Sequence, residues 1–365
     1  LRKLKWFKKN NIKEPNILNF LDLVCLGTVC DVVPLIGLNR AIVTQGLKII
    51  KNRSNLGIKT LYDLCGIAAQ PNTYHIGYSI GPRINAGGRV GKSSYGAELL
   101  ISNDAEHSYK IASSLDNYNK QRQKIEKDLL LKVDIQAEKN QTDPVLVLSD
   151  DDWHEGIIGI VASRIKDKYH KPTFLISFNG KDGKGSARSI FGFDIGTAII
   201  SAVQSNILQK GGGHKMAGGF SIQKNKMITF KEFVIKKFNK ANLNDNQSKN
   251  LYLDAILSPS ALNENFFNDI NLLAPFGAGN SEPTFVLENI KVVNSTIVAD
   301  KHIKTVMYGK NGKIIRGIAF NSKGGIMEEY LSKSYKKRFH IAGKVTLKEW
   351  GGKKDIEFVI NDIAI

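Results

Sequence analysis

Cysteine is scarce in this sequence, and long hydrophobic runs are missing. The three cysteines among 365 residues, Cys25, Cys30 and Cys65, lack the paired spacing of a zinc site and are too few for a disulfide framework. We therefore expect reduced thiols in or near the core. The longest apolar runs, such as 144–148, fall far short of the ~20 residues that a membrane span requires, and no signal-peptide pattern opens the chain. These absences predict a cytoplasmic protein without a membrane partner.

Several catalytic signatures are also absent. The sequence has no Walker A motif, no dinucleotide-binding fingerprint and no Ser–His–Asp set with suggestive spacing. Acidic residues are outnumbered by basic ones, 34 against 52, which gives a formal net charge of +18 at pH 7. Such an excess indicates a polyanionic partner, and nucleic acid fits best. A genome bias toward lysine and asparagine is the alternative explanation, because composition alone does not place the charge.

Residues 17–50 are predicted to form a helix, a turn and a second helix, with Gly27 breaking and Pro34 closing an apolar run. Asp31 is the only acidic residue inside that run. A carboxylate among Val, Leu and Ile side chains is costly to bury unless it is paired, protonated or bound to a metal. Asp31 is therefore a candidate site residue, and a helix N-cap is the alternative.

A long helix is predicted from near Asn103 to about Ala137. Apolar residues recur at spacings of four and three from Ile111 to Leu129, and Asn103 has capping-box spacing to Glu106. Such a helix would be about 50 Å long at 1.5 Å per residue. Because most of its faces are polar, we interpret it as a connector between domains.

Two further folding units follow the long helix. The first is a βαβ unit that continues into more strands and helices, and a polar cluster at 242–250 reads as a linker. The second has five strands with a helix after the third, the order of an OB-fold, a barrel that commonly binds oligonucleotides. The βαβ unit covers 145–148, 155–169 and 172–178, followed by an extended segment at 183–189, helices at 195–204 and 227–240 and a short strand at 219–222. The five strands lie near 284–298, 303–308, 313–320, 339–346 and 355–363, with a helix at 326–334 and turns at Asn311–Gly312 and Gly351–Gly352.

Four short segments concentrate arginine, histidine, serine and glycine where simple packing would not require them. Arginine offers bidentate donors to phosphate, and glycine lets a nucleic-acid strand approach closely, so this inventory suits a phosphodiester better than redox or acyl chemistry. Taken singly, each segment has a structural alternative: a tight turn, a helix cap, an exposed basic strand or a flexible loop. The candidate substrate-binding residues are Arg83, Asn85 and Arg89 in 81–91, His154 and Arg164 in 152–164, Ser186 and Arg188 in 183–189, and Gly212 and Gly213 beside His214 in 211–220.

The segment 211–220, GGGHKMAGGF, has glycine at five of its ten positions. Backbone N–H groups freed from side-chain crowding can converge on an anion, and His214 and Lys215 would add donors and charge. The segment is therefore predicted to be a phosphate-binding loop, with an incidental flexible loop as the alternative.

Six segments stand out along the chain: DLVCLGTVCDVVPL, GPRINAGGRVG, DDWHEGIIGIVASRI, GKGSARSI, GGGHKMAGGF and LAPFGAGNSEPTF. They occur in the order and approximate spacing of the RecJ single-strand-specific exonucleases, and the chain resembles that family over almost its entire length. Several segments of this length in fixed order are far more specific than any single motif. The resemblance implies a 5′→3′ exonuclease that hydrolyses single-stranded DNA to 5′-mononucleotides in repair and recombination, using Mn²⁺ or Mg²⁺. Single-strand-binding protein and a RecQ-type helicase are the further partners it suggests.

The resemblance also implies an α/β architecture and roles for individual residues. Asp31 matches the last aspartate of the family's metal site, and His214 matches a histidine near the scissile nucleotide, so both are assigned to the catalytic site. Ser186 and Arg188 match residues that hold the 5′-terminal phosphate, and Arg89 matches an arginine at the substrate strand. The implied domains are the C-terminal part of a catalytic DHH domain (1–102), a connecting helix (103–140), a DHH-associated α/β domain (141–243) and an OB-fold (251–365).

The chain departs from the family pattern at the metal site, because it contains no Asp-His-His triplet. Two divalent ions need several carboxylates and histidines, and Asp31 alone does not supply them. We therefore expect the missing ligands upstream of Leu1, and little or no activity from these residues alone. An inactive scaffold that binds single-stranded nucleic acid is the main alternative. A relative that degrades short oligoribonucleotides or cyclic dinucleotides is a third, which the predicted OB-fold disfavours.

Overall fold

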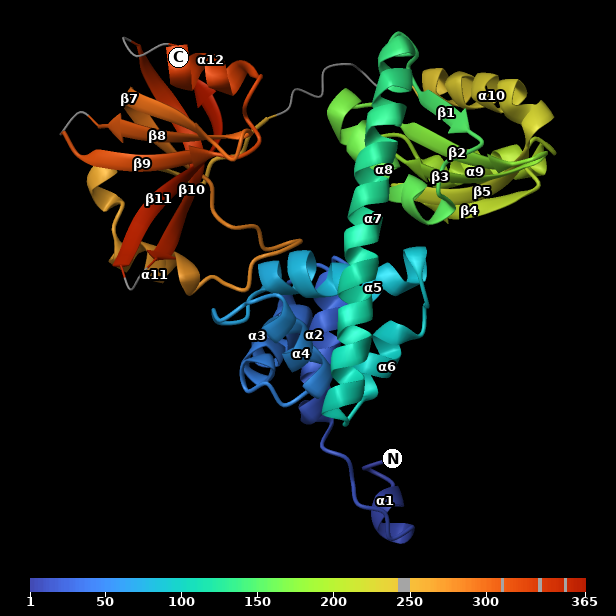
Figure 1. Ribbon diagram of the computed structural model, residues 1–365, viewed down its shortest axis with the longest axis horizontal. Helices are drawn as coiled ribbons and strands as arrows, with labels where there is room; N and C mark the ends of the chain where they lie inside the picture. The colour runs from blue at the N-terminus through green and yellow to red at the C-terminus, as the bar shows by residue number, and fades with distance from the viewer. Residues whose placement is uncertain (242–249, 310–311, 334–336, 351–352) are drawn as a thin grey trace. The chain divides into compact units, whose positions relative to one another are not determined.

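The computed structural model describes residues 1–241, 250–309, 312–333, 337–350 and 353–365, coloured along the chain in Figure 1. The chain forms two compact units, each with its own core. Within the described residues, no helix is long and apolar enough to cross a lipid bilayer. One unit contains Leu1–Asn52, Gln70–Ile76 and Lys249–Ile365, and the other contains Arg53–Ala69 and Gly77–Ser248.

The first unit begins with helices whose close contact depends on a glycine. Helix α2 (Leu21–Cys30) packs on α3 (Gly37–Lys51). A Cβ atom at Gly46 would lie 2.3 Å from the Cβ atom of Cys25, so only glycine permits this approach. Burial raises the pKa of the Cys25 thiol to about 12, which keeps that thiol protonated at neutral pH. The predicted helix, turn and helix are confirmed. Two short segments precede α2: α1 (Trp6–Lys9) and a 3₁₀ helix (Ile17–Phe20).

The C-terminal part of this unit is a closed β-barrel, drawn in orange to red in Figure 1. Its strands are β7 (Phe285–Val298), β8 (His302–Tyr308), β9 (Ile314–Ala319), β10 (Arg338–Trp350) and β11 (Lys353–Ala364), with α12 (Ile326–Lys333) after the third. The pairing order is β7, β8, β9, β11, β10, and β10 pairs back with β7. The predicted OB-fold is confirmed, whereas the turn residues Asn311, Gly351 and Gly352 and most of the 242–250 linker lie outside the described residues. A strand β6 (Ala255–Leu257) and a helix α11 (Glu264–Asn271) precede β7.

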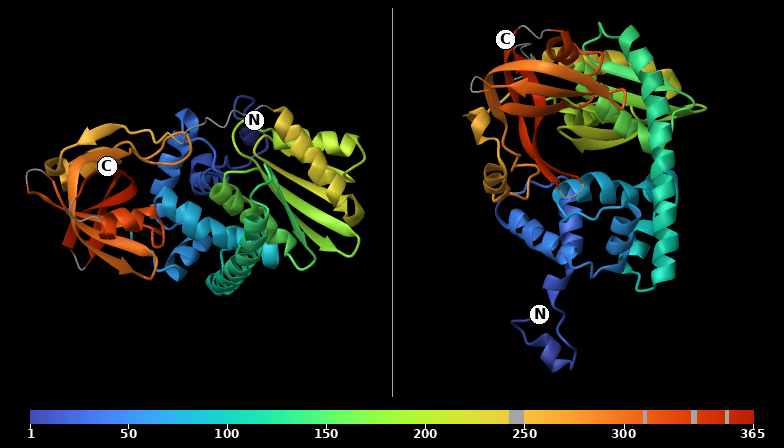
Figure 2. Two further views of the ribbon diagram at one scale, coloured as in Figure 1. Left: turned by 90° about the horizontal axis from the view of Figure 1, so that it is seen from above. Right: turned by 60° about the vertical axis from the view of Figure 1, so that its left-hand side comes forward.

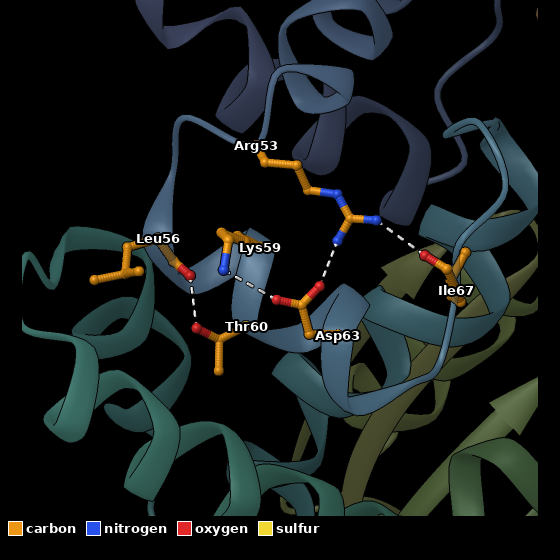
Figure 3. Close-up of polar contacts among 6 residues, drawn as sticks. All are labelled: Arg53, Leu56, Lys59, Thr60, Asp63 and Ile67. Atoms are coloured by element: carbon orange, nitrogen blue, oxygen red, sulfur yellow. Dashed lines mark hydrogen bonds and ion pairs between the residues drawn. The ribbon is translucent and has the colours of Figure 1, made fainter.

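Arg53 fastens the end of helix α4 (Leu56–Leu64) in the second unit. Its Nη1 atom donates to Asp63 Oδ1 at 2.9 Å, and its Nη2 atom donates to the carbonyl oxygen of Ile67 at 2.9 Å (Figure 3). Lys59 donates to the other oxygen of the same carboxylate at 3.1 Å. These contacts tie α4 to the chain that follows it.

The segment 81–91 forms a helix, α5 (Gly81–Val90), and not the tight turn that was its structural alternative. Pro82 occupies the first turn, where its missing N–H is not needed. A Cβ atom at Gly87 would lie 2.5 Å from the carbonyl oxygen of Lys92, so this glycine allows the chain to leave the helix closely packed. A π-helical segment (His75–Ile80) precedes α5, and α6 (Tyr95–Ile101) follows it.

The rest of the second unit is a five-stranded sheet between two layers of helices. Helix α8 (Glu155–Tyr169) connects β1 (Leu146–Asp150) to the parallel β2 (Thr173–Asn179), which confirms the predicted βαβ unit. Leu146 and Leu148 face α8, whereas Val145 and Val147 face the opposite core. That core lies under α9 (Ile195–Gln204) and α10 (Met227–Lys240). The sheet order is β1, β2, β3 (Asp182–Arg188), β5 (Ala217–Gln223) and β4 (Lys210–His214).

The predicted long helix is α7 (Ala105–Lys139), which runs the length of the second unit (Figure 2). Its N-cap is Asp104, whose side chain accepts from the His107 N–H at 2.6 Å, so the cap expected at Asn103 is wrong by one residue. Asp104 has the extended backbone that an N-cap requires. The first part of α7 packs on α4, α5 and α6, and its last turns pack on α8 and β1.

A substitution at Phe230 tests the packing of the core under α10. Phe230 is fully buried, and its ring centroid lies 5.5 Å from that of Phe174 and 5.0 Å from that of Phe220. We expect Phe230→Ala to lower the free energy of unfolding by about 3–5 kcal/mol because it leaves a cavity. Urea unfolding followed by circular dichroism measures this. Ile228→Ala, at an exposed position of the same helix, serves as the control and should cost less than about 0.5 kcal/mol; equal losses would contradict the packing.

Candidate functional site

Strand β3 presents a serine and an arginine on one face of the sheet. Ala187 is fully buried in the core under α9 and α10, and the half-buried Ser186 and Arg188 alternate with it. Helix α8 packs against β3 on the face of Ser186 and Arg188. The extended strand predicted over 183–189 is therefore present, and its alternation places both side chains against α8.

Two glycines on α8 make room for arginines from two other elements. A Cβ atom at Gly159 would lie 2.8 Å from Ser186 Oγ and 3.2 Å from Arg188 Nη2. A Cβ atom at Gly156 would lie 2.5 Å from the carbonyl oxygen of Arg89, and Arg89 Nη1 donates to the Gly156 carbonyl at 3.1 Å. The first turns of α8 thus contact Arg89 of α5 and Arg188 of β3. Sequence reasoning missed both glycines, although their spacing of three puts them on one helix face.

The two arginines leave positive charge at this place. Burial, and then repulsion from Arg89, lowers the pKa of Arg188. Burial, and then repulsion from Arg122, lowers the pKa of Arg89, although Glu126 opposes this. Within the part of the chain that the structure describes, neither Arg89 nor Arg188 forms an ion pair with a carboxylate. Because guanidinium groups stay protonated, the site attracts an anion.

Glu126 is a buried carboxylate, 3% exposed, that connects α7 to α8. It accepts from Arg122 Nη1 at 2.6 Å and forms an ion pair with Arg164. Arg164 was predicted to bind substrate, but the structure gives it this intramolecular partner, so any contact with DNA stays a prediction. Glu126 itself was missed, although a charged i,i+4 pair inside an apolar stripe was a visible signal.

Arg83 is held by an ion pair. Its Nε atom donates to Asp116 Oδ1 at 2.8 Å, and its Nη1 atom donates to the Ser79 carbonyl at 2.7 Å. Lys120 lies 2.8 Å from the other oxygen of the same carboxylate. These contacts account for Arg83 structurally, while Asn85 is exposed on α5. Substrate binding by either residue stays a prediction.

His154 is the N-cap of α8. Its Nδ1 atom accepts from the Gly156 N–H at 3.1 Å, and its backbone is extended. This is the helix-cap alternative considered for the segment. The cap nevertheless lies beside the arginine site, because a Cβ atom at Gly156 would be 3.2 Å from the His154 ring. Contact between His154 and substrate stays a prediction.

The glycine-rich segment 211–220 is a β-hairpin of β4 and β5, so the expectation of a loop is wrong. Its glycines serve close packing. A Cβ atom at Gly213 would lie 2.3 Å from the Ala217 carbonyl oxygen, and one at Gly218 would lie 2.4 Å from the Ile199 side chain of α9. At Gly212 no atom lies within 4 Å of a Cβ position. Packing therefore explains Gly213, and phosphate binding by Gly212 or Gly213 stays a prediction.

His214 stands exposed at the end of β4. Its Nδ1 atom accepts from the Met216 N–H at 3.4 Å, so the hairpin turn orients the imidazole. The hairpin also joins the chain after β3, because Ser189 N–H donates to the Met216 carbonyl at 2.9 Å. The turn that carries His214 is therefore hydrogen-bonded to the residue after Arg188.

Asp31 is not buried. It is the exposed C-cap of α2, so neither the burial inferred from its apolar neighbours nor the N-cap alternative is correct. The run is apolar because α2 buries Cys25 and Leu26, whereas Asp31 follows the last turn. Across the described ranges, no three His, Cys, Asp or Glu side chains are grouped so as to hold a metal ion. These residues therefore do not fit a two-metal site by themselves.

Two parts of the chain match family models. Residues 142–240, which contain the sheet and Arg188 but not Arg89, match the DHHA1 domain. Residues 253–362, which contain the barrel, match the RecJ OB domain. The fold and the matches together define a protein that combines a DHHA1 domain, a long helix and an OB-fold barrel.

The chain belongs to the RecJ family. It is 32% identical over 376 residues to the single-stranded-DNA-specific exonuclease RecJ of Dickeya dadantii, which covers 100% of this chain and 64% of that protein. The RecJ of Thermus thermophilus is 34% identical over 284 residues, or 78% of this chain and 41% of that protein. A crystal structure of RecJ in complex with Mn²⁺ from Thermus thermophilus has a TM-score of 0.83 at 28% identity, covering 98% of this chain and 51% of that one. The chain thus spans less than two thirds of these relatives' length.

The Arg83–Asp116 pair predicts a pH-dependent contribution to stability. Burial by itself would raise the pKa of Asp116, but hydrogen bonds from Lys120 and Arg83 outweigh it and lower this pKa. A lowered carboxyl pKa stabilises the fold above the unfolded value of about 3.9, and the gain is lost as pH falls through the folded pKa. We expect Asp116→Asn to lower the free energy of unfolding by roughly 2 kcal/mol at pH 7. The gap to the unsubstituted chain should shrink below about pH 4.

Urea unfolding at a series of pH values measures this gap. Asp63→Asn is the matched control, because its pairs with Arg53 and Lys59 are exposed and should contribute less than about 1 kcal/mol. A gap for Asp116→Asn that stays constant from neutral to acid pH would refute the assigned role of the carboxylate.

Proposed function

We propose that the second unit binds the 5′-terminal phosphate of single-stranded DNA between α8 and β3. One observation carries the proposal: Arg89 and Arg188 come close enough for their charges to repel, beside the Ser186 hydroxyl and the glycine face of α8. A terminal phosphate carries more negative charge than an internal phosphodiester, so it gains most from two arginines. This supports binding at a strand end.

The site offers several hydrogen-bond donors that could each bind a different oxygen of one phosphate. Guanidinium groups donate in a planar fork, and a hydroxyl can donate one further hydrogen bond. The first turn of α8 adds the partial positive charge of a helix N-terminus. Arg188 Nη1 lies 3.3 Å from Ser186 Oγ, so a single phosphate can contact both. The residues proposed to contact the phosphate belong to two helices and a strand.

We propose further that the whole protein to which this chain belongs is a 5′→3′ exonuclease that degrades single-stranded DNA to 5′-mononucleotides in repair and recombination. Membership of the RecJ family and the OB-fold barrel support this substrate. A grip on the 5′-phosphate would set the register of the strand, so that hydrolysis removes one nucleotide at a time. A cytoplasmic location and partnership with single-strand-binding protein or a RecQ-type helicase stay predictions.

Mn²⁺ or Mg²⁺ is the expected cofactor, because RecJ crystal structures contain these ions. Asp31 is the metal ligand and His214 the residue near the scissile nucleotide that the family motifs assign here. Since the described residues do not group three donors, we propose that further ligands come from outside these 365 residues. The same observation favours the alternative function, a scaffold that binds single-stranded nucleic acid without cutting it.

Arg188→Gln tests the phosphate site. We expect roughly tenfold weaker binding of a 5′-phosphorylated single strand, because a charge-assisted bidentate contact is lost. Binding of the same strand with a 5′-hydroxyl should change little. Fluorescence anisotropy with both oligonucleotides measures the difference, and equal weakening on both ends would contradict the assignment. Arg316→Gln, which removes an exposed cation of the barrel, is the control that should not distinguish the two ends.

Gly159→Ala tests the same site without removing a charge. The added methyl group would press on Ser186 Oγ and Arg188 Nη2, so preference for the 5′-phosphate should fall. Gly88→Ala is matched to it, since no atom lies within 4 Å of a Cβ atom there. An unchanged preference in Gly159→Ala would argue against a phosphate between α8 and β3.

A hydrolysis assay distinguishes the proposed exonuclease from a scaffold that binds single strands without cutting them. We expect the 365-residue chain to bind labelled single strands but release no mononucleotide with Mn²⁺, whereas an extended protein that supplies the missing ligands should release 5′-mononucleotides. Thin-layer chromatography of the products measures this. Cleavage by the chain alone would overturn the assignment of missing ligands, and cleavage of duplex DNA at an equal rate would overturn the proposed specificity.

A further inference from the structure

Phe191 is a large aromatic side chain that the fold leaves in solvent. It is 74% exposed, whereas Phe193, two residues later, is 5% exposed and packs edge-on against Phe238 at 5.3 Å. Burying a phenylalanine stabilises a protein appreciably, so a chain that buries one ring and exposes the other gains nothing in stability from the second. Phe191 follows Arg188 by three residues, so its exposed ring lies beside the candidate site.

The backbone holds Phe191 in a defined position. Phe193 N–H donates to the Ile190 carbonyl at 3.4 Å, which closes a turn with Phe191 at its corner. Gly192 follows with φ +91°, a conformation that favours glycine. The fully buried Ser189 donates through its hydroxyl to the Phe193 carbonyl at 2.6 Å. The exposed ring therefore projects from a turn that is anchored on both sides.

This turn is also bonded to the hairpin that carries His214. Ser189 N–H donates to the Met216 carbonyl at 2.9 Å, and Ile195 N–H donates to the Lys215 carbonyl at 3.2 Å. Met216 is a second exposed apolar side chain, at 42%. Phe191 and Met216 thus lie on two neighbouring turns. The first follows Arg188 after one residue, and the second belongs to the hairpin of His214 and Lys215.

We propose that Phe191 and Met216 form a platform on which one nucleobase of the DNA strand stacks. The neighbouring Arg188 and Lys215 favour an occupant with negative charge, and the exposed Phe191 ring favours one with a flat apolar surface; a nucleotide has both. Base–aromatic stacking tolerates any sequence, because every base has a π-face. A thioether beside the ring adds a polarisable contact. The platform rests on the proposed function, since it needs the strand whose 5′-phosphate is held at Arg188.

The experiment uses the full chain and 5′-phosphorylated single strands of equal length, in which one nucleotide near the 5′ end is abasic. Phe191→Leu keeps an apolar side chain but removes the ring, and we expect roughly tenfold weaker binding of the intact strand. On the strand that is abasic at the stacking position, Phe191→Leu should bind as the unsubstituted chain does. Phe191→Trp should restore binding of the intact strand.

The controls distinguish this platform from the phosphate site. Phe193→Leu changes the buried ring of the same turn, so it should lower the unfolding temperature. Its effect on DNA binding should not depend on which nucleotide is abasic. If Arg188→Gln loses the 5′-phosphate preference while Phe191→Leu binds every strand normally, the platform is refuted and the phosphate site stands. If Phe191→Leu weakens intact and abasic strands equally at all positions, stacking is refuted as well. Both proposals are overturned if Arg188→Gln keeps the preference for a 5′-phosphate and Phe191→Leu binds intact and abasic strands as the unsubstituted chain does.

Discussion

The close approach of α8 to β3 is the contact on which the site depends. At Gly159 the helix has no side chain, and Ser186 and Arg188 occupy the space that a methyl group would take. The same helix meets Arg89 at Gly156. A helix with larger residues at these two positions would stand further from the sheet, and the side chains of Arg89 and Arg188 would lose their present contacts with α8.

Electrostatics follows from the same packing. Arginines from α5, α7, α8 and β3 gather within one unit, and Glu126 is the buried carboxylate that two of them share. Through their ion pairs with Glu126, Arg122 and Arg164 join α7 to α8. Arg89 and Arg188 keep their charge for an external anion. A paired set and an unpaired set thus lie in the same unit, and the unpaired set is the one to which we assign the proposed phosphate.

Sequence patterns predicted those features that local geometry determines. The spacing from Ile111 to Leu129 predicted α7, and alternation along 183–189 put Ser186 and Arg188 on one face. The hairpin at 211–220 was not predictable in the same way. Glycines are needed there because the hairpin packs closely against α9, which contacts it only in the folded chain. The environment of Asp31 was not predicted for a related reason: its apolar neighbours belong to a helix that ends before it. The Glu126 pairing with Arg164 joins two helices, which a one-dimensional pattern does not bring together.

The length of α7 has a consequence for the proposed phosphate site. One continuous helix of 35 residues packs on α5 at one part and on α8 at another, and α8 in turn packs on β3. Arg89 on α5 and Arg188 on β3 are both connected to α7 through this packing, although 99 positions separate them in the sequence. Their relative position is therefore set when the protein folds, before any strand arrives. Binding of a strand end at the proposed site would then require little ordering of the backbone, and more of the contact free energy would appear as affinity.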